Sequence, residues 1–456
     1  MQTRKIFGIL CIAGFLFSAC NLIQRQATPV IVPVVIQNSE KIPVEVTRII
    51  RKTQLIPVEV TRIVLETQIV PVEVTRIVRE TIVVTPAPPP ESPVNVTQGN
   101  TLLVPRSQHT ATRLADGRIL LVGGSTSPEG FLADVEMFNP LTGIITQVTP
   151  LHTPRHDHTA TLLPDGRVLV SGGYSLPKQW LIDAEVYDPS MDTWTVVPSL
   201  YTHGVQHTAT LMKDGRVLVV GGAVRSGPGT DRVEIFDPRT NSWSEAMPLA
   251  SDRASHTAQL LEDGRVLVAG GGGGSGVPAG GDALLFDPQT NTWTATGPMV
   301  TPRIFGQSVR LSDGRVLVVG GTSQDGVTSN GPNRKMFTKA EIFNPATNEW
   351  TAATDLSQAR YAHSLVLLQD GRVLVSGGSR DWDCCWSDNS FVREIEVYYP
   401  AVDRWTSAGD LPLPAAFSAA ILLPNGSVWV TGGKAGQSAT TFWSDTWLLT
   451  PMSTQP

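Results

Sequence analysis

Along most of the chain, one arrangement of apolar and polar residues returns seven times. In each copy, two short apolar runs flank an Asp-Gly or Asn-Gly pair, as in TATLLPDGRVLVSGG at residues 159–173. A two-residue turn of this kind needs positive φ at its central residues and is a strong signal for a β-hairpin. The turns occur at Asp116-Gly117, Asp165-Gly166, Asp214-Gly215, Asp263-Gly264, Asp313-Gly314, Asp370-Gly371 and Asn425-Gly426. Each copy therefore predicts an antiparallel strand pair.

The residues after each turn predict two further strands. A run such as RVLVVGG is apolar at successive positions, which indicates a strand covered on both faces. A variable loop, a strand such as VEIFDP, a PxTNxW-type turn and a fourth strand follow. The fourth strand carries a tryptophan in five copies: Trp194, Trp243, Trp293, Trp350 and Trp405. Seven units of four antiparallel strands, without helical periodicity, predict an all-β fold, a seven-bladed β-propeller.

The ends of the repeat region predict how the ring closes. The seventh copy stops after its third strand, near DTWLLTP, and residues 99–105 (GNTLLVP) stand before the first copy. We predict that residues 99–105 supply the missing fourth strand of blade 7, which removes an open sheet edge. The predicted propeller therefore occupies residues 98–456.

The first twenty residues have the features of a bacterial lipoprotein signal. Arg4 and Lys5 precede the apolar run IFGILCIAGFLF, whose length suits a signal peptide better than a membrane span. The ending FSAC resembles a lipobox, which implies cleavage before Cys20 and lipidation of its thiol. Phe17 is unusual in that motif, so plain secretion is the alternative. We expect the protein outside the cytoplasm, held on the membrane or cell surface by Cys20.

Residues 21–97 form the predicted stalk. Residues 42–83 contain three fourteen-residue units, IPVEVTRIIRKTQL, IPVEVTRIVLETQI and VPVEVTRIVRETIV. Their β-branched residues favour extended backbone, whereas one proline per unit limits sheet formation to edges. The units are either an extended spacer or strands that pair between neighbouring molecules. The Pro-rich stretch VVTPAPPPESPVN that follows is typical of semi-rigid polyproline II.

The net charge limits the classes of binding partner, and the cysteine content limits the possible disulfides. The formal net charge is -6, so there is no basic field of the kind that nucleic acid requires. Outside the signal and Cys20, only the adjacent pair Cys384 and Cys385 remains, which excludes a disulfide framework. This pair could form a vicinal disulfide outside the reducing cytosol.

The paired glycines, the acidic and aromatic third strand and the spaced tryptophans resemble kelch repeats. The DGRVLVVGG form is similar to the kelch-like central domain of the galactose oxidase family. The resemblance covers about 350 residues and implies a propeller fold. It leaves function open, because propellers serve catalysis, recognition and scaffolding.

Two side-chain rows recur before the turns. A histidine lies seven residues before the turn in five copies: His109, His158, His207, His256 and His363. Equivalent positions on neighbouring sheets lie about 10 Å apart, too far for one metal ion, so we predict local hydrogen bonds and no metal site. Three residues earlier stand Arg106, Arg155, Arg253, Arg303 and Arg360. These arginines either form local salt bridges or make an electropositive channel mouth that binds anionic groups.

The loops after the paired glycines are long in blades 5 and 6, and long loops on rigid scaffolds often carry binding specificity. Trp382 and Trp386 in the blade 6 loop either stack on a ligand or fill the loop. The galactose oxidase resemblance implies a copper-radical oxidase, with a Cys-linked Tyr, a Tyr-His ligand pair and another His. The sequence has no Tyr-His pair; Tyr361-Ala362-His363 and Tyr201-Thr202-His203 come nearest. We therefore predict a surface binding module without a cofactor, for an extracellular protein, peptide or glycan, with an oxidoreductase or a scaffold as alternatives.

Overall fold

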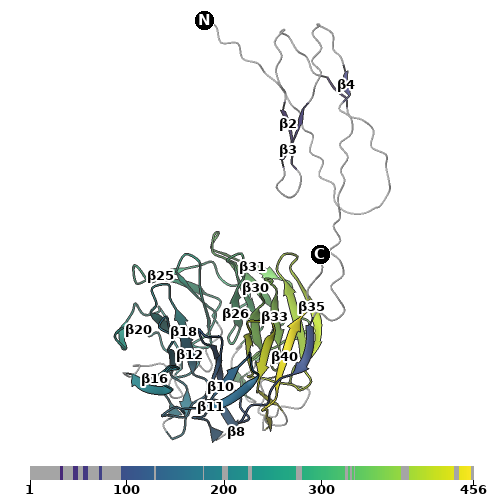
Figure 1. Cartoon of the computed structure of the whole chain (residues 1–456). Coiled ribbons are helices and arrows are strands. Elements are labelled where there is room, and N and C mark those ends of the chain that lie inside the picture. The colour runs from purple at the N-terminus through teal and green to yellow at the C-terminus, as the bar shows by residue number, and fades with distance from the viewer. Residues whose placement is uncertain are drawn as a thin grey trace. The chain divides into compact units, whose positions relative to one another are not determined.

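The computed structural model describes most of residues 94–452 and four short strands before them (Figure 1). Within 94–452 the residues outside the description are 128–129, 178, 198–203, 224–228, 274–279, 324–326, 329–330, 333, 382–389 and 436–440. The chain divides into two compact units, Met1–Pro86 and Ala87–Pro456. The named elements in the described residues are all strands. The described part of the chain has no helix with the length and hydropathy of a membrane span.

The second unit consists of seven four-stranded antiparallel sheets, which confirms the predicted propeller. The innermost strands are β6 (Thr110–Arg113), β12 (Thr159–Leu162), β18 (Thr208–Leu211), β22 (Thr257–Leu260), β26 (Gln307–Arg310), β32 (Ser364–Leu367) and β36 (Ala419–Leu422). The second strands are β7 (Ile119–Val122), β13 (Val168–Ser171), β19 (Val217–Val220), β23 (Val266–Ala269), β27 (Val316–Val319), β33 (Val373–Ser376) and β37 (Val428–Thr431). Every residue of the second strands is buried, as the unbroken apolar runs predict.

The outer half of each blade follows the predicted order. The third strands are β10 (Val135–Asn139), β16 (Ala184–Asp188), β20 (Val233–Asp237), β24 (Ala283–Asp287), β30 (Ala340–Asn344), β34 (Glu394–Tyr399) and β40 (Thr446–Pro451). The outermost strands are β11 (Ile144–Val148), β17 (Thr193–Val197), β21 (Ser242–Glu245), β25 (Thr292–Ala295), β31 (Glu349–Ala353), β35 (Arg404–Asp410) and β5 (Val94–Gln98). Among the described residues, short hairpins lie in four of the loops after the paired glycines: β8 (Ser125–Ser127) with β9 (Gly130–Phe131), β14 (Tyr174–Ser175) with β15 (Gln179–Trp180), β28 (Val327–Thr328) with β29 (Gly331–Pro332), and β38 (Lys434–Ala435) with β39 (Thr441–Phe442).

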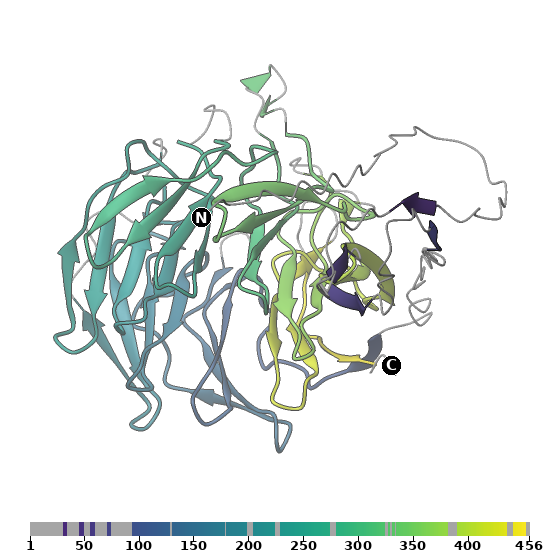
Figure 2. The ribbon, with the colours of Figure 1, turned by 90° about the horizontal axis from the view of Figure 1, so that it is seen from above.

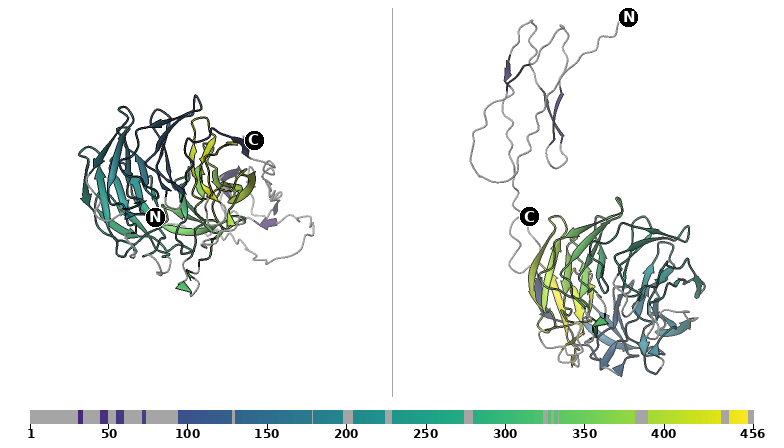
Figure 3. Two further views of the ribbon diagram at one scale, coloured as in Figure 1. Left: turned by 90° about the horizontal axis from the view of Figure 1, so that it is seen from below. Right: turned by 180° about the vertical axis from the view of Figure 1, so that it is seen from behind.

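Apolar side chains between adjacent blades form the core. Leu317 and Val319 of blade 5, for example, share a buried cluster with Val373, Val375 and Tyr398 of blade 6. Each innermost strand contacts the innermost strands of both neighbouring blades, including β36 with β6, so the ring is closed. Figures 2 and 3 show the blades following one another in chain order, with the yellow C-terminal blade beside the blue N-terminal one.

Antiparallel strands give the propeller two different faces. The Asp-Gly turns and the turns between third and outermost strands lie on one face, which we call the hairpin-turn face. The loops after the paired glycines and the connections between blades lie on the other, the loop face. The second glycine of the pair lies at the start of a loop-face loop, against the connection between blades. Gly173, for example, has φ 107°, and a Cβ there would lie 2.8 Å from the His156 carbonyl oxygen, so glycine is required.

The predicted closing segment, residues 99–105, is wrong by a few residues. β5, Val94–Gln98, pairs antiparallel with β40 and completes blade 7, and Val94 is buried in the cluster that holds Leu449. Residues 99–105 instead form the connection into blade 1, where Leu102 packs between blades 7 and 1. The correct alignment matches Pro105-Arg106 with Pro154-Arg155, which moves the preceding strand back to 94–98. The propeller therefore begins before residue 98.

Removal of this strand should destabilise the propeller. A chain that begins at Gly99 exposes the edge of β40 and loses the buried Val94 side chain, so we expect a loss of at least about 2 kcal/mol. A chain that begins at Ala87 keeps β5 and should unfold at the same temperature as the full chain. Thermal unfolding followed by circular dichroism measures the difference, and equal melting temperatures for the two truncations would contradict this closure.

Only short strands are described before residue 94. β2 (Glu45–Ile49) pairs with β3 (Leu55–Glu59), and β1 (Ile31–Pro33) pairs with β4 (Pro71–Glu73), both antiparallel. The first two fourteen-residue units thus pair within one chain along these segments. Pairing between molecules stays a prediction, and Cys20 with the signal lies outside the described residues.

Candidate functional site

The five row arginines are buried structural residues. Their relative exposures are between 0% and 3%. Each guanidinium donates to the carbonyl of the first glycine of its own blade's pair, as Arg155 does to Gly172 at 2.8 Å. Four also pair with a buried glutamate of the third strand: Arg106 with Glu136, Arg155 with Glu185, Arg303 with Glu341 and Arg360 with Glu396. The expectation of an electropositive mouth made by these arginines is therefore wrong, and the salt-bridge interpretation is confirmed.

The partner glutamates explain why this arrangement recurs. Glu341 accepts hydrogen bonds from the backbone N–H groups of Val300 and Thr301, at 2.6 and 2.8 Å, in the connection that enters blade 5. Glu136 and Glu185 bind the preceding connections of their own blades in the same way. One ion pair thus fixes the third strand, the paired glycines and the incoming chain of one blade. In blade 4, where Leu284 replaces the glutamate, Arg253 pairs with Asp282 instead.

The row histidines connect neighbouring blades, as predicted. Nε2 of His158 lies 3.0 Å from Oγ1 of Thr110 in the preceding blade, and His207 and His256 have equivalent bonds to Thr159 and Thr208. His109 bonds Thr431, at the end of the second strand of blade 7. His363 differs, because Gln307 stands where the threonine would be, and neither of its buried ring nitrogens has a partner among the described residues. Burial, together with nearby arginine charges, lowers the pKa of His109 and of His363 to about 3. These imidazoles are therefore neutral in the folded protein.

A ring of seven residues surrounds the propeller axis at the loop face. We call it the axial ring; it consists of Gln108, Asp157, Gln206, Ser255, Phe305, Ala362 and Phe417, each with φ between 52° and 62°. Backbone bonds run from blade to blade around it, for example from the Phe305 N–H to the Ser255 carbonyl at 2.9 Å. Each ring residue lies in the connection between blades, two residues before an innermost strand. The residue before it forms a β-bridge to the loop after the paired glycines, as Ser107 does with Ser125, which fixes its position.

The axial ring has two chemically different sectors. In blades 1–4 its side chains are polar: Gln108 donates to Asp157 at 2.8 Å, and Ser255 to Gln206 at 2.8 Å. Although burial opposes it, hydrogen bonds from His156 and Gln108 and the charge of Lys434 lower the pKa of Asp157. Asp157 is therefore a carboxylate at neutral pH.

In blades 5 and 7 the ring residues are aromatic, Phe305 and Phe417, whereas blade 6 contributes Ala362, which follows Tyr361 in the chain. The Tyr361 ring lies between those of Phe305 and Phe417, with centroid distances of 6.3 and 5.9 Å. Two cations rest on this arc, Arg334 5.8 Å from the Phe305 ring centroid and Lys434 4.6 Å from that of Phe417. Burial lowers the pKa of Arg334 to about 10 and also lowers that of Lys434. Tyr361 is only 2% exposed, so the exposed apolar part of the arc comes from Phe305 and Phe417. These two rings lie against partly desolvated positive charges, an arrangement in which cation–π attraction is strong.

Sequence reasoning missed these residues. Phe305, Phe417 and Lys434 occupy positions at which the residue type differs from blade to blade. This difference from the other copies is the sequence signal that could have identified them. The residues predicted in the blade 6 loop, Trp382, Trp386, Cys384 and Cys385, lie outside the described residues.

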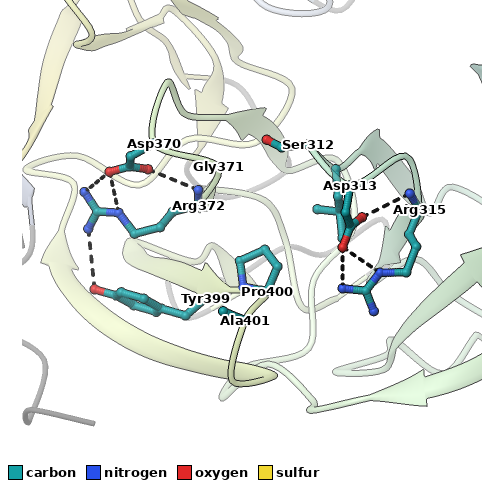
Figure 4. Close-up of a pocket in the computed structure, with 10 residues that line it drawn as sticks. Ser312, Asp313, Arg315, Asp370, Gly371, Arg372, Tyr399, Pro400 and Ala401 are labelled. Atoms are coloured by element: carbon teal, nitrogen blue, oxygen red, sulfur yellow. Dashed lines mark hydrogen bonds and ion pairs between the residues drawn. The ribbon is translucent and has the colours of Figure 1, made fainter. Parts of the chain in front are cut away.

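A second concave site lies on the hairpin-turn face between blades 5 and 6 (Figure 4). Its cavity has a volume of about 400 Å³. Its walls are the Asp-Gly-Arg turns of the two blades, and Tyr399, Pro400 and Ala401 come from the outer turn of blade 6.

The described residues do not fit the copper centre implied by the galactose oxidase resemblance. They contain no group of three or more His, Cys, Asp and Glu side chains placed to hold a metal ion. Tyr361 lies in the aromatic arc, whereas His363 is buried between blades 5 and 6. Tyr201 and His203 lie outside the description.

Four-stranded sheets around a closed ring define the protein as a seven-bladed β-propeller. The family model for the KLHDC2/KLHL20/DRC7 kelch-repeats domain matches residues 92–271 and 206–433. The chain therefore belongs to the kelch-repeat family, whose propellers are typically protein-binding modules.

Individual relatives match over shorter stretches. Beta-scruin of Limulus polyphemus is 32% identical over 92 residues, 20% of this chain and 9% of scruin. Galactose oxidase of Gibberella zeae is 29% identical over 101 residues, 22% of this chain and 14% of the oxidase. The chain thus matches well under two thirds of either protein. A solved fungal alcohol oxidase of the AA5 family, in complex with copper, superposes with a TM-score of 0.62 at 20% identity over 79% of this chain and 76% of that one, which supports the shared fold.

Proposed function

We propose that this protein is an extracytoplasmic binding module, anchored by a lipid on Cys20, whose propeller binds an extracellular protein, peptide or glycan at its loop face. The observation that carries the proposal is the axial ring. Its seven equivalent positions are polar in blades 1–4 and are Phe305, Ala362 and Phe417 in blades 5–7. Two cations from neighbouring segments, Arg334 and Lys434, lie against the two phenylalanines. A purely structural ring has no need of this division, because its closure depends on backbone hydrogen bonds.

The chemistry of the ring suits recognition. Aromatic side chains and desolvated cations are the groups that dominate binding energy at interfaces. Gln108, Asp157 and Gln206 add hydrogen-bonding groups. Gln108 lies next to Phe417 and accepts a hydrogen bond from Lys434 at 3.3 Å, so the two sectors are continuous there and a ligand with apolar and polar parts can contact both.

The course of the chain supports display of this face. β40 runs from the loop face to the hairpin-turn face, and Val94 of β5 pairs with its last residue, Pro451. The polypeptide therefore enters the propeller at the hairpin-turn face. The axial ring lies on the face of the propeller opposite to Val94.

We expect the double variant Phe417→Ala, Lys434→Ala to weaken ligand binding at least about tenfold, because it removes one end of the aromatic arc and its cation. The full chain would be tested on arrays of extracellular proteins, peptides and glycans, followed by calorimetry on the hits. Lys213→Ala, on the hairpin-turn face, removes a lysine that donates to the Glu262 carbonyl and serves as the matched control. Equal affinity for the double variant and the wild type would overturn the assignment of the ring.

A further inference from the structure

The cavity between blades 5 and 6 is more than a consequence of the repeat, because one residue in it breaks a local rule. In blades 1–5 the last residue of the third strand is Asn or Asp: Asn139, Asp188, Asp237, Asp287 and Asn344. Each of these side chains accepts a hydrogen bond from the backbone N–H two residues later and thereby caps the outer turn. Blade 6 has Tyr399 instead, which cannot make this bond. Blade 7, with Thr450 at this position, also lacks the cap, and the blade 6 turn is closed by a bond from the Val402 N–H to the Tyr399 carbonyl at 3.2 Å. A side chain that departs from the local rule of its repeat is typical of functional positions.

The Tyr399 side chain forms part of the cavity instead (Figure 4). Arg372 lies with its guanidinium carbon 5.6 Å from the Tyr399 ring centroid, and its Nη1 is 3.4 Å from the tyrosine hydroxyl. Arg372 is itself only 6% exposed and also donates to the Met452 carbonyl at 3.1 Å. The ring is thus supported by a buried, fully engaged side chain.

The space of this cavity is filled by an arginine between blades 2 and 3 and is left free here. In the equivalent place between blades 2 and 3, Arg167 donates to the Pro238 carbonyl at 2.7 Å and to Asn241 at 3.0 Å. Between blades 5 and 6, the Arg315 guanidinium bonds only Asp313 among the described residues. Among the described residues Arg118, Arg216 and Arg265 also bond only the aspartate of their own turn, so Arg167 is the exception. Asp403, the counterpart of Asn241, already accepts hydrogen bonds from Tyr398 and Thr354. The space filled by Arg167 in one seam is therefore left free in the other.

The charges of the cavity indicate a neutral ligand. Asp313 and Asp370 are each paired with the arginine two residues later, so neither end carries net charge. Their side chains are nevertheless 49% and 46% exposed, which leaves carboxylate oxygens able to accept further hydrogen bonds. Between them lie Tyr399, Pro400 and Ala401. A ligand with an apolar ring face and hydroxyl groups at both ends would complement this arrangement. The cavity volume lies within the range of small-molecule sites.

We propose that the cavity lined by Tyr399, the two Asp-Gly-Arg turns and Pro400 binds a neutral saccharide unit. Sugar hydroxyls would donate to Asp313 and Asp370 and accept from Arg315, while the C–H face of the sugar ring packs on Tyr399 and Pro400. This site lies on the hairpin-turn face, so it is separate from the axial ring and does not depend on the ligand proposed there.

Tyr399→Asp tests the proposal, because it restores a capping residue as in blades 1–5 and removes the ring. Calorimetry on the full chain would use a panel of neutral sugars: glucose, galactose, mannose, N-acetylglucosamine, maltose, cellobiose and chitobiose. We expect at least one sugar to bind, and Tyr399→Asp to weaken it at least about tenfold while the melting temperature stays equal or rises. Ala401→Trp, at an exposed position, fills the cavity by a second route and should give the same loss. Asp237→Ala, which removes the blade 3 cap, should lower stability and leave sugar binding unchanged.

The outcomes separate this site from the axial ring. Sugar binding that is lost in Tyr399→Asp and Ala401→Trp but kept in Phe417→Ala, Lys434→Ala supports the cavity, whatever the loop face binds. Binding lost only in the Phe417→Ala, Lys434→Ala variant overturns the cavity and places the sugar at the axial ring. Absence of binding for the whole panel also overturns it.

Discussion

Arg303→Met should destabilise the propeller by about 3–5 kcal/mol, because it leaves the Glu341 carboxylate buried without its counter-ion. Arg303 and Glu341 are 2% and 1% exposed, and the arginine also donates to the Gly320 and Lys339 carbonyls at 2.8 and 2.7 Å. Both carbonyls would lose this donor inside the protein, where an unmade hydrogen bond is costly, although Lys339 keeps its bond from the Gly320 N–H. Chemical denaturation of the variant and the wild type measures the difference.

Two further variants identify the cause. The double variant Arg303→Met, Glu341→Leu removes both charges and should be less destabilised than Arg303→Met alone, because paired buried ions can be replaced by apolar residues at small cost. Blade 7 has such a replacement already, with Ala415 and Trp447 at the two positions. Arg118→Ala breaks a largely exposed pair with Asp116 and should change stability by less than about 1 kcal/mol. A loss for Arg303→Met no larger than that for Arg118→Ala would contradict the structural role.

Stability should fall steadily as the pH is lowered from about 6.5 toward 3. The pKa of His109 and that of His363 are about 3 in the folded protein, against an ordinary value of 6.5. Between these values the unfolded chain binds protons that the folded protein does not, so the free energy of unfolding decreases with decreasing pH. Each histidine should contribute about 1.4 kcal/mol per pH unit in this window. The stabilising effect is fully present above pH 6.5 and is lost as the pH approaches 3.

His363→Phe provides the direct test of this pH dependence. Neither ring nitrogen of His363 has a partner among the described residues, so the substitution removes a titrating group without breaking a side-chain hydrogen bond there. The slope of unfolding free energy against pH should become shallower by about 1.4 kcal/mol per unit between roughly pH 4.5 and 6. Denaturation midpoints over that range measure the slope independently of any change in stability at pH 8. A slope equal to that of the wild type would show that His363 does not contribute.

The repeat architecture could be predicted from local sequence, because each element carries its own signal. Asp-Gly turns between apolar runs specify hairpins within about fifteen residues, and seven copies specify the number of blades. The histidine row was also predictable, since spacing alone excludes a shared metal ion. The closing strand was misplaced because VNVTQ and GNTLLVP are both short and rich in β-branched or apolar residues. Only pairing with β40, more than three hundred residues away in the chain, distinguishes them.

The candidate sites depend on contacts that local sequence does not record. The sequence around Arg303 does not show whether its guanidinium contacts a ligand or another residue of the protein. In the structure it is buried and pairs with Glu341, 38 residues further along the chain. The axial ring gathers one residue from each blade, and the cavity beside Tyr399 is formed by the Asp-Gly-Arg turns of blades 5 and 6 together with the outer turn of blade 6.

The sequence by itself determined the hairpins, the paired glycines, the seven blades and hence the kelch propeller, because turn chemistry and strand periodicity act over a few residues. Only the tertiary structure decided which polar groups form buried bonds within the propeller and which are accessible at its surface. Burial and partners in neighbouring strands and blades determine this difference, and neither can be read from local sequence. The row arginines are structural for this reason, whereas Phe305, Phe417, Lys434 and Tyr399 line the two candidate sites.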